Sequence, residues 1–229
     1  LLREARQRGD LLAEASLTNL SGTLMWLARD RPEEARKALA TAMQPWAGLG
    51  FRTQHFTSLA SHVQIELYGG DVAAACHLLE SQWPQLQRSM LLHIENIRMF
   101  MLHLRGSCAA ALAETELDDG RYRRIAARCA RKLSKEKAPW GEALGQLLQA
   151  ALANLQGNRE RAAALLGVAA SHLEELGTGL YAAAARYRQG ELLGGAGAGL
   201  TAKAEAAMAA NQVRDPAAMA NVYVPGFST

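Results

Sequence analysis

The chain has 229 residues, of which 49% are hydrophobic, and its formal net charge at neutral pH is +3. This length and hydrophobic fraction can bury a sizeable core, and so small a net charge gives no general attraction to nucleic acid or to a membrane surface. Alanine and leucine, both strong helix formers, dominate the composition, whereas β-branched residues are sparse. We therefore expect an all-α fold in a single domain over residues 1–229.

Capping and turn residues predict the N-terminal elements. Residues 1–8 read as the end of a helix already under way, so we expect the chain to be a fragment of a longer protein. Asp10 is a suitable N-cap for a helix that runs to about residue 29. Pro32 fits the first position of the next helix, because the backbone N–H that proline lacks would have no partner there. This helix should stop near Pro45.

Helical hairpins are predicted to follow one another along the chain. They pair residues 10–29 with 32–43, 51–68 with 72–81, 89–105 with 108–117, 139–155 with 159–176, and 180–193 with 200–210. Most of the turns contain glycine, which accepts the left-handed backbone that ends a helix. We place the turn of the third pair at Gly106-Ser107 and expect Trp83-Pro84 to end the second pair. Asn158 is predicted to cap the helix that follows it. Residues 212–229 are left as a C-terminal tail.

A weak internal repeat accompanies these hairpins. A small alanine occurs early in the second helix of each pair, at Ala35, Ala75, Ala111, Ala162 and Ala204, with separations of 40, 36, 51 and 42 residues. Each hairpin is apolar on more than one face, so it cannot bury itself alone and must stack on its neighbours. We predict an α-α superhelix of stacked helical hairpins, built from degenerate tetratricopeptide-like repeats.

An extra basic helix is predicted between repeats, over residues 118–137. On a helix, one face of this segment would carry Arg121, Arg124, Arg128, Lys132 and Lys135. Such a face could contact an acidic partner, a phosphate-bearing ligand or nucleic acid. Aromatic residues are nearly absent from the segment, which argues against a single-stranded nucleic-acid site.

The alternative for the basic helix is an ordinary solvated face. The acids just upstream, which would neutralise it in part, are Glu114, Glu116, Asp118 and Asp119. Asp118-Asp119 precede Gly120, so we expect them to form a turn and an N-terminal charge cap rather than a catalytic carboxylate pair.

The first helix of the third hairpin supplies a second candidate surface. Its apolar stripe leaves His93, Asn96, Phe100 and His103 on other faces. First helices usually line the concave side of stacked helical pairs, so these side chains could meet a partner peptide. The alternative is ordinary packing and solvation.

Residues that could carry catalysis or bind a metal do not converge in the sequence. It contains no Gly-rich phosphate loop, no H-E-x-x-H and no G-x-S-x-G motif. His55 and His62 could share a helix face, but two turns apart they are too distant to hold a metal by themselves. The cysteines, Cys76, Cys108 and Cys129, are odd in number and form no C-x-x-C pair, which is typical of a reducing cytoplasm. No apolar run approaches the roughly 20 residues that span a bilayer. We expect no catalytic residue, no metal and no cofactor.

The C-terminal part resembles the end of a group of very large bacterial signalling proteins. The segments that carry this resemblance are Glu191-Leu192-Leu193-Gly194-Gly195, Met208, Arg214-Asp215-Pro216-Ala217-Ala218-Met219 and Pro225-Gly226-Phe227. In those proteins a serine/threonine kinase domain is followed by an AAA-type (STAND-like) ATPase module and a long tetratricopeptide-like tail. The resemblance implies a regulatory, partner-binding tail that contains neither the kinase nor the ATPase.

Two functions remain open from the sequence. The first is a non-enzymatic, cytoplasmic interaction module that binds a protein or peptide partner, or other domains of the same chain. The second is an effector-sensing helical domain that binds a small ligand inside the superhelix, as in the related maltose-responsive transcription activators. A closed, deep pocket would favour the second function, and an open concave groove the first.

Overall fold

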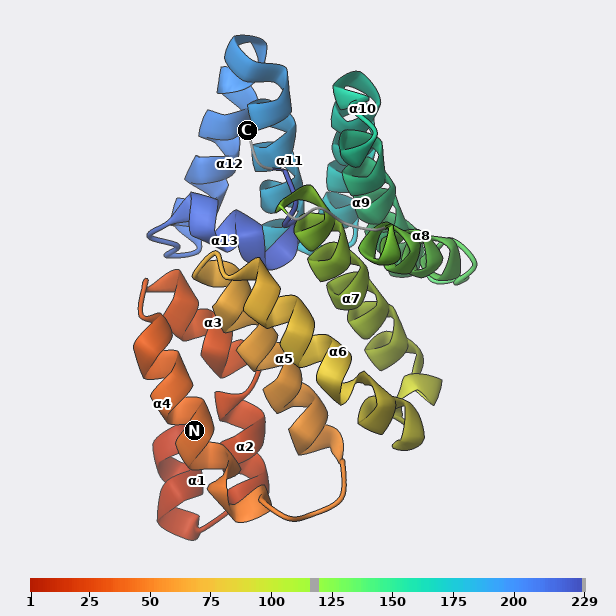
Figure 1. Cartoon of the computed structure of the whole chain (residues 1–229). Coiled ribbons are helices and arrows are strands. Elements are labelled where there is room, and N and C mark those ends of the chain that lie inside the picture. Colours follow the sequence, from red (N-terminus) through yellow and green to blue (C-terminus); the bar gives the residue numbers. More distant parts are fainter. Residues whose placement is uncertain (116–119, 228–229) are drawn as a thin grey trace.

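The chain folds into an all-helical superhelix over the residues that the structure describes. The structure is a computed structural model, and it describes residues 1–115 and 120–227. Helices pack mainly against their neighbours in the chain, so the predicted α-α superhelix of stacked hairpins is confirmed (Figure 1). Asp118 and Asp119, predicted to form a turn and a charge cap, and Glu116, predicted to neutralise the basic face in part, lie outside the described residues.

The helices divide into an N-terminal and a C-terminal half. The N-terminal half contains α1 (Leu2–Arg8), α2 (Leu11–Thr18), α3 (Ser21–Ala28), α4 (Pro32–Met43), α5 (Thr53–Tyr68) and α6 (Val72–Arg88). The C-terminal half contains α7 (Glu95–Thr115), α8 (Arg121–Leu133), α9 (Pro139–Leu155), α10 (Arg159–Glu175), α11 (Gly179–Leu193), α12 (Ala198–Ala210) and α13 (Pro216–Tyr223). Short 3₁₀ turns lie at η1 (Gln44–Trp46), η2 (Leu91–His93) and η3 (Gly194–Gly197).

Side-chain caps begin several of the helices. Asp10 accepts a hydrogen bond from the backbone N–H of Ala13 at 2.9 Å, and Asn158 accepts one from Arg161 at 3.0 Å. Both predicted caps are therefore confirmed, as is Pro32 in the first turn of α4. Each cap pairs a backbone N–H that the helix itself leaves without a partner.

The helix predicted from residue 10 to about residue 29 is broken at Asn19-Leu20, so its single span is wrong. Asn19 is only 1% exposed, and its amide donates to the Gln54 carbonyl at 3.2 Å and to Thr57 Oγ1 at 2.8 Å. The Leu20 backbone N–H donates to Ser61 Oγ at 2.7 Å. These bonds to α5 pair the side-chain amide nitrogen of Asn19 and the backbone N–H of Leu20, which helps to explain why the chain turns here, whereas Thr18 Oγ1 and Asn19 Oδ1 stay buried without a partner among the described residues.

Helix α6 continues through Pro84, although the sequence analysis ended it at Trp83-Pro84. A proline inside a helix costs about 3 kcal/mol relative to alanine. Trp83 and Leu86 are both buried on the core side, and the Arg105 guanidinium lies 4.2 Å from the Trp83 ring centroid. Packing of this last stretch outweighs the local penalty of the proline.

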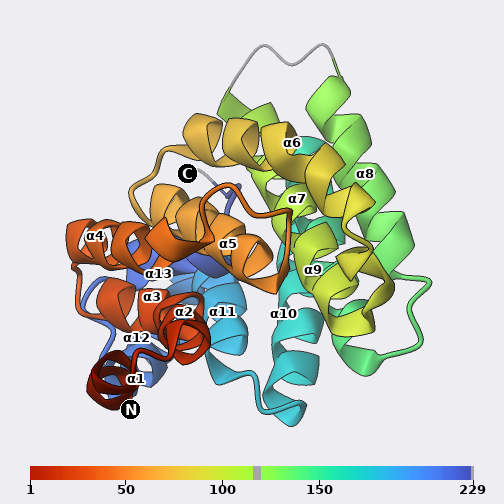
Figure 2. The ribbon, with the colours of Figure 1, turned by 90° about the horizontal axis from the view of Figure 1, so that it is seen from below.

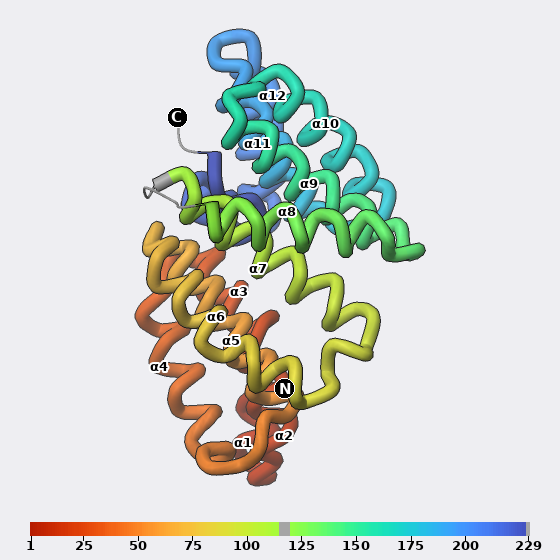
Figure 3. The backbone as a smooth tube through the Cα atoms, turned by 45° about the vertical axis from the view of Figure 1, so that its right-hand side comes forward, coloured from red at the N-terminus to blue at the C-terminus, as the bar shows by residue number. Residues whose placement is uncertain are grey.

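Helix α7 also runs without interruption, so the turn predicted at Gly106-Ser107 is wrong (Figure 3). A Cβ at Gly106 would lie 2.4 Å from Leu148 Cδ1 and 2.9 Å from Cys129 Cβ. The glycine therefore lets α7 cross α8 and α9 closely, and it does not end a helix.

The pairing of the third hairpin changes in consequence. The partner of α7 is α8, the basic helix that was expected to be an extra element between repeats (Figure 2). Ala111 lies deep inside α7, so it is not the early alanine of a second helix and its place in the predicted repeat is wrong. The stacking was predictable from apolar faces, whereas the register of this repeat was not.

The C-terminal segment (residues 212–227) is a structured closing element rather than a tail. Its helix α13 packs against both α11 and α5, and so joins the two halves of the superhelix (Figure 1). The Arg214 backbone N–H donates to the Ala28 carbonyl at 2.9 Å. Phe227 is buried, and Gly226 lies so close to Ala111 that a Cβ there would come within 3.0 Å of its Cα.

Arg188 on α11 anchors this segment. Its side chain is 6% exposed, and its Nε donates to the Val224 carbonyl at 3.1 Å. The guanidinium also donates to Glu191 Oε2 at 2.6 Å and to the Asn221 side-chain oxygen. A buried guanidinium is tolerated only when its donors are paired, so Arg188 and the C-terminal segment need each other.

Candidate functional site

A pocket of about 350 Å³ lies inside the superhelix, where the two halves meet. Its lining residues are Leu20, Ser21, Leu24, Phe56, Gln64, Asn96, Ile97, Phe100, Trp140, Tyr181 and Tyr223. They come from α3 and the residue before it, α5, α7, α9, α11 and α13. We call this cavity the central pocket. Because α13 supplies one wall, the closing of the superhelix completes the pocket.

Aromatic rings form much of the wall of the central pocket. Phe56 and Phe100 meet edge to face with ring centroids 6.3 Å apart, and Tyr181 and Tyr223 do so at 4.6 Å. Burial raises the pKa of Tyr223 to about 12, and it raises that of Tyr181 further. These shifts report surroundings that disfavour charge, because a phenolate would lose its hydration there.

Two buried polar atoms in this wall have no hydrogen-bond partner among the described residues. They are the side-chain oxygen of Gln64, a residue only 3% exposed, and the indole nitrogen of Trp140. A buried polar group left unpaired costs about 1–3 kcal/mol. Pockets that bind small molecules combine apolar walls with a few such placed polar groups. Both atoms expose almost no surface to the pocket, so the side chains of Gln64 and Trp140 would have to turn before either atom could bond to a ligand.

The lining of the central pocket carries no Asp, Glu, Lys, Arg or His side chain. An ion entering it would lose hydration and gain no opposite charge in return. The pocket therefore fits a neutral, largely apolar molecule.

The structure separates the four residues predicted on the concave face. Asn96 and Phe100 line the central pocket. His103 does not line it but supports its wall, since its ring meets that of Tyr181 with centroids 5.6 Å apart. His103 is 2% exposed, and burial lowers its pKa to about 3. His93 is exposed at the end of η2 and lies outside the pocket.

The five residues predicted to form one basic face do not all line the same surface feature. Arg124 and Lys135 line two adjoining hollows between α8 and α9, whereas Arg128 and Lys132 are exposed on α8 but line neither. Arg121 is also exposed, with its guanidinium 5.5 Å from the Tyr122 ring centroid. The upstream acid Glu114 accepts a hydrogen bond from Asn154 at 2.6 Å.

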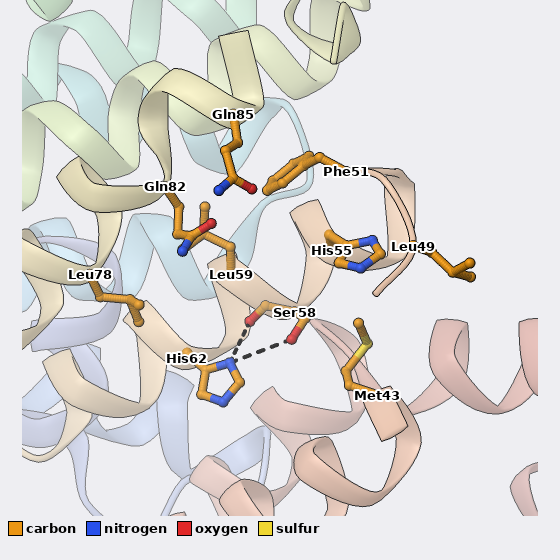
Figure 4. A pocket seen from close by; sticks show the side chains of 10 residues that line it. All are labelled: Met43, Leu49, Phe51, His55, Ser58, Leu59, His62, Leu78, Gln82 and Gln85. Carbon is orange, nitrogen blue, oxygen red and sulfur yellow. Dashed lines mark hydrogen bonds between the residues drawn. The ribbon is translucent and has the colours of Figure 1, made fainter. Parts of the chain in front are cut away.

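A smaller pocket of about 210 Å³ lies between α5, α6 and the loop before α5 (Figure 4). His55 and His62 both line it, as their spacing on one helix face suggested. The ring of His55 bonds to the backbone of Trp46 at 3.1 Å and of Arg52 at 3.3 Å, while His62 Nδ1 lies 3.0 Å from the Ser58 carbonyl oxygen. The His62 Nδ1–H therefore donates to that carbonyl, so this nitrogen cannot take a proton from the Ser58 hydroxyl.

None of the three cysteines forms a disulfide, and all three are buried. Burial raises the pKa of the Cys108 thiol well above its ordinary value and that of Cys129 to about 11. A thiol is reactive as its thiolate, so these side chains act as packing groups at neutral pH. Within residues 1–115 and 120–227, no three His, Cys, Asp or Glu side chains cluster as metal ligands would.

No protein-family model, no curated protein and no solved structure matches the chain. Among the described helices, none combines the length and the hydropathy that crossing a membrane requires. The interpretation of the site therefore depends on its geometry.

Most of the residues that line the central pocket were not predicted from the sequence. Gln64, Tyr181 and Tyr223 lie far apart in the chain, and no local pattern connects them. The available signal was Gln64 itself, an uncharged polar residue between the apolar residues Val63 and Ile65, but such a residue often faces solvent.

Proposed function

We propose that the chain is a non-enzymatic regulatory module that senses a small neutral ligand in the central pocket. The observation that carries this proposal is the central pocket itself, whose lining is largely aromatic and carries no charged side chain. Its tyrosines have raised pKa values, so no side chain in the lining exchanges protons readily near neutral pH, as acid–base catalysis would require.

The position of the C-terminal segment supports a ligand over a long peptide as the occupant of the concave side. Helix α13 packs on α5 and α11, the first helices of the second and fifth predicted hairpins, and first helices usually line the concave side. What remains between them is a pocket of about 350 Å³, the lower end of the size range of small-molecule sites. Its walls come from both halves, so a bound ligand would stabilise their closed arrangement, by about 2.7 kcal/mol at 100 times its Kd.

The resemblance to large bacterial signalling proteins supplies the context of the proposal. In such a chain this module would report ligand binding to a kinase or ATPase located elsewhere. A protein partner is the second candidate. The observation that favours it is the pair of hollows between α8 and α9, which Arg124, Arg131 and Lys135 line.

The proposal is tested with quinolin-2-one, a neutral bicyclic lactam whose adjacent N–H and carbonyl match a carboxamide. Isothermal titration should show binding, and quinoline-2-carboxylate, a charged compound of similar size, should bind at least about tenfold more weakly because the pocket has no cation to pair with it. Asn96→Trp should fill the pocket and abolish binding.

His93→Trp is the control, because it places the same side chain at an exposed residue that does not line the pocket. Equal binding of the neutral and the charged compound, or full binding to Asn96→Trp, would contradict the proposed site. The proposal would also be wrong if neither quinolin-2-one nor a panel of other neutral bicyclic amides bound at about 1 mM, the weakest affinity that such a pocket should show.

A further inference from the structure

A shallow groove runs between α8 and α9 on the outer side of the superhelix, away from the central pocket. It consists of two hollows of about 480 and 220 Å³ that share Ala127 and Leu152. Figures 1 and 2 show α8 and α9 side by side at the edge of the molecule. We call this feature the α8–α9 groove.

The floor of the α8–α9 groove is apolar and its rim is cationic. Ala127, Leu152 and Leu155 contribute to the floor, and all three are only partly buried. Arg124, Arg131 and Lys135 stand along the α8 side. No carboxylate lines either hollow. Apolar surface bordered by one sign of charge marks a binding site for a partner with the opposite charge.

Among the described residues, Glu136 is the acid next to this rim in the chain, and it does not neutralise it. Glu136 directly follows Lys135, but both its oxygens accept hydrogen bonds from Arg98 at 2.8 Å. The Arg98 guanidinium accordingly lowers the pKa of Glu136. Within the described residues, Arg124, Arg131 and Lys135 form no ion pair. Their charges are therefore available to a partner.

We infer that the α8–α9 groove docks an acidic amphipathic helix of a partner protein. From Arg124 to Arg131 the rim extends about 10 Å along α8, which matches two turns of a helix, and Lys135 follows just beyond the end of α8. The apolar face of such a helix would cover Leu152 and Leu155, while its carboxylates would reach the rim cations at helical spacing. This inference is independent of the ligand proposed for the central pocket.

A polyanion such as RNA fits the α8–α9 groove less well. Its phosphates would pair with the cations but would leave the apolar floor uncovered, and the lining offers no aromatic ring on which a base could stack. The floor is thus the feature that distinguishes the two classes of partner.

The test uses a labelled synthetic helix of about 15 residues, with leucines on one face and glutamates on both flanks, in fluorescence anisotropy titrations against the full chain. Arg131→Glu should weaken its binding by about tenfold or more, because the variant replaces attraction by repulsion. Lys203→Glu is the matched control, since it makes the same charge change on an exposed residue of α12 and should leave binding unchanged.

A second variant separates the two classes of partner. Ala127→Arg places a cation in the middle of the floor, where it should weaken the amphipathic helix by about tenfold yet strengthen binding of heparin, used as a polyanion probe. A scrambled peptide of the same charge should bind weakly. Docking of a helix is overturned if the labelled helix does not bind at about 1 mM, or if scrambled peptide and heparin bind as tightly and Ala127→Arg strengthens all three.

Discussion

At the scale of single residues, the central pocket holds hydrogen-bonding groups that the protein does not use itself. The Gln64 side-chain oxygen and the Trp140 indole nitrogen are buried without partners in the described part of the chain, as is the side-chain oxygen of Asn19, whose amide nitrogen donates to two groups on α5. Unpaired groups reduce stability, so an apolar side chain of similar size would suit the empty pocket better.

Replacing Gln64 should therefore separate stability from binding. Gln64→Met removes the unpaired oxygen at nearly constant volume and should raise the free energy of unfolding by about 1–2 kcal/mol, measured by urea denaturation. The same change should weaken quinolin-2-one binding by about tenfold. Gln7→Met on the exposed face of α1 is the control and should alter neither quantity. A loss of stability in Gln64→Met would show that the amide already has a partner.

His103 makes a prediction about pH. Burial lowers its pKa to about 3 in the folded protein, whereas an unfolded histidine titrates near 6.5. The unfolded chain therefore binds one more proton between these values, so stability falls as the pH drops below about 6.5. From pH 7 to pH 5, this group should lower the free energy of unfolding by about 2 kcal/mol.

Denaturation of the wild type and His103→Gln at both pH values measures that contribution. The variant is less stable overall, but its loss between pH 7 and pH 5 should be smaller by the amount given for His103. Identical pH dependence in the two proteins would mean that His103 is not buried as a neutral ring.

At the scale of elements, glycine has different roles at positions that look alike in the sequence. Gly157 and Gly177 have the left-handed backbone expected after a helix, with φ of 77° and 72°. Gly106 lies inside α7 and faces Leu148 and Cys129 instead. The same residue type thus ends one helix and lets another cross its neighbours.

A methyl group at Gly106 should expose this difference. Gly106→Ala forces a Cβ against Leu148 and Cys129, so we expect the free energy of unfolding to fall by about 1–3 kcal/mol. Gly199→Ala in α12 is the control of opposite sign: no atom lies within 4 Å of its new Cβ, and alanine should stabilise the helix by about 0.5–1 kcal/mol. Equal effects in urea denaturation would contradict the close crossing of α7.

The elements that were predicted correctly are those whose signals are local. Asp10, Pro32 and Asn158 act within one turn of themselves, so their neighbours in the sequence suffice. The break at Asn19 and the continuity of α7 depend on residues about 40 positions away, Ser61 and Leu148, which the sequence does not place nearby. The residues of the central pocket also come from distant parts of the chain. Only Asn96 and Phe100, on the helix predicted to line the concave side, were therefore singled out from the sequence.

At the scale of the whole molecule, the C-terminal segment determines how the two halves meet. Arg188 on α11 donates hydrogen bonds to the Val224 carbonyl and to the Asn221 side chain. Helix α13 spans from α11 to α5. Most helical-repeat proteins have contacts between adjacent repeats only. Here residues near the two ends of the chain also touch, through Arg214 and Ala28.

Loss of the Arg188 anchor should release this segment. Arg188→Met leaves buried acceptors unpaired and should lower the free energy of unfolding by about 2–4 kcal/mol. Amide hydrogen exchange over residues 216–227 should increase more than exchange in α9. Arg186→Met on the same helix removes an ion pair to the largely exposed Glu174 and should cost less than about 1 kcal/mol. Similar exchange in both variants would show that Arg188 is not the anchor.

The bond between Arg214 and Ala28 also restricts how this architecture can vary in length. An open solenoid tolerates insertion or deletion of a hairpin, because each unit needs only its immediate neighbours. In this chain one additional hairpin between α5 and α11 would carry α13 out of reach of α5, and one fewer would make them collide. The number of units is therefore fixed by the span that α13 must bridge.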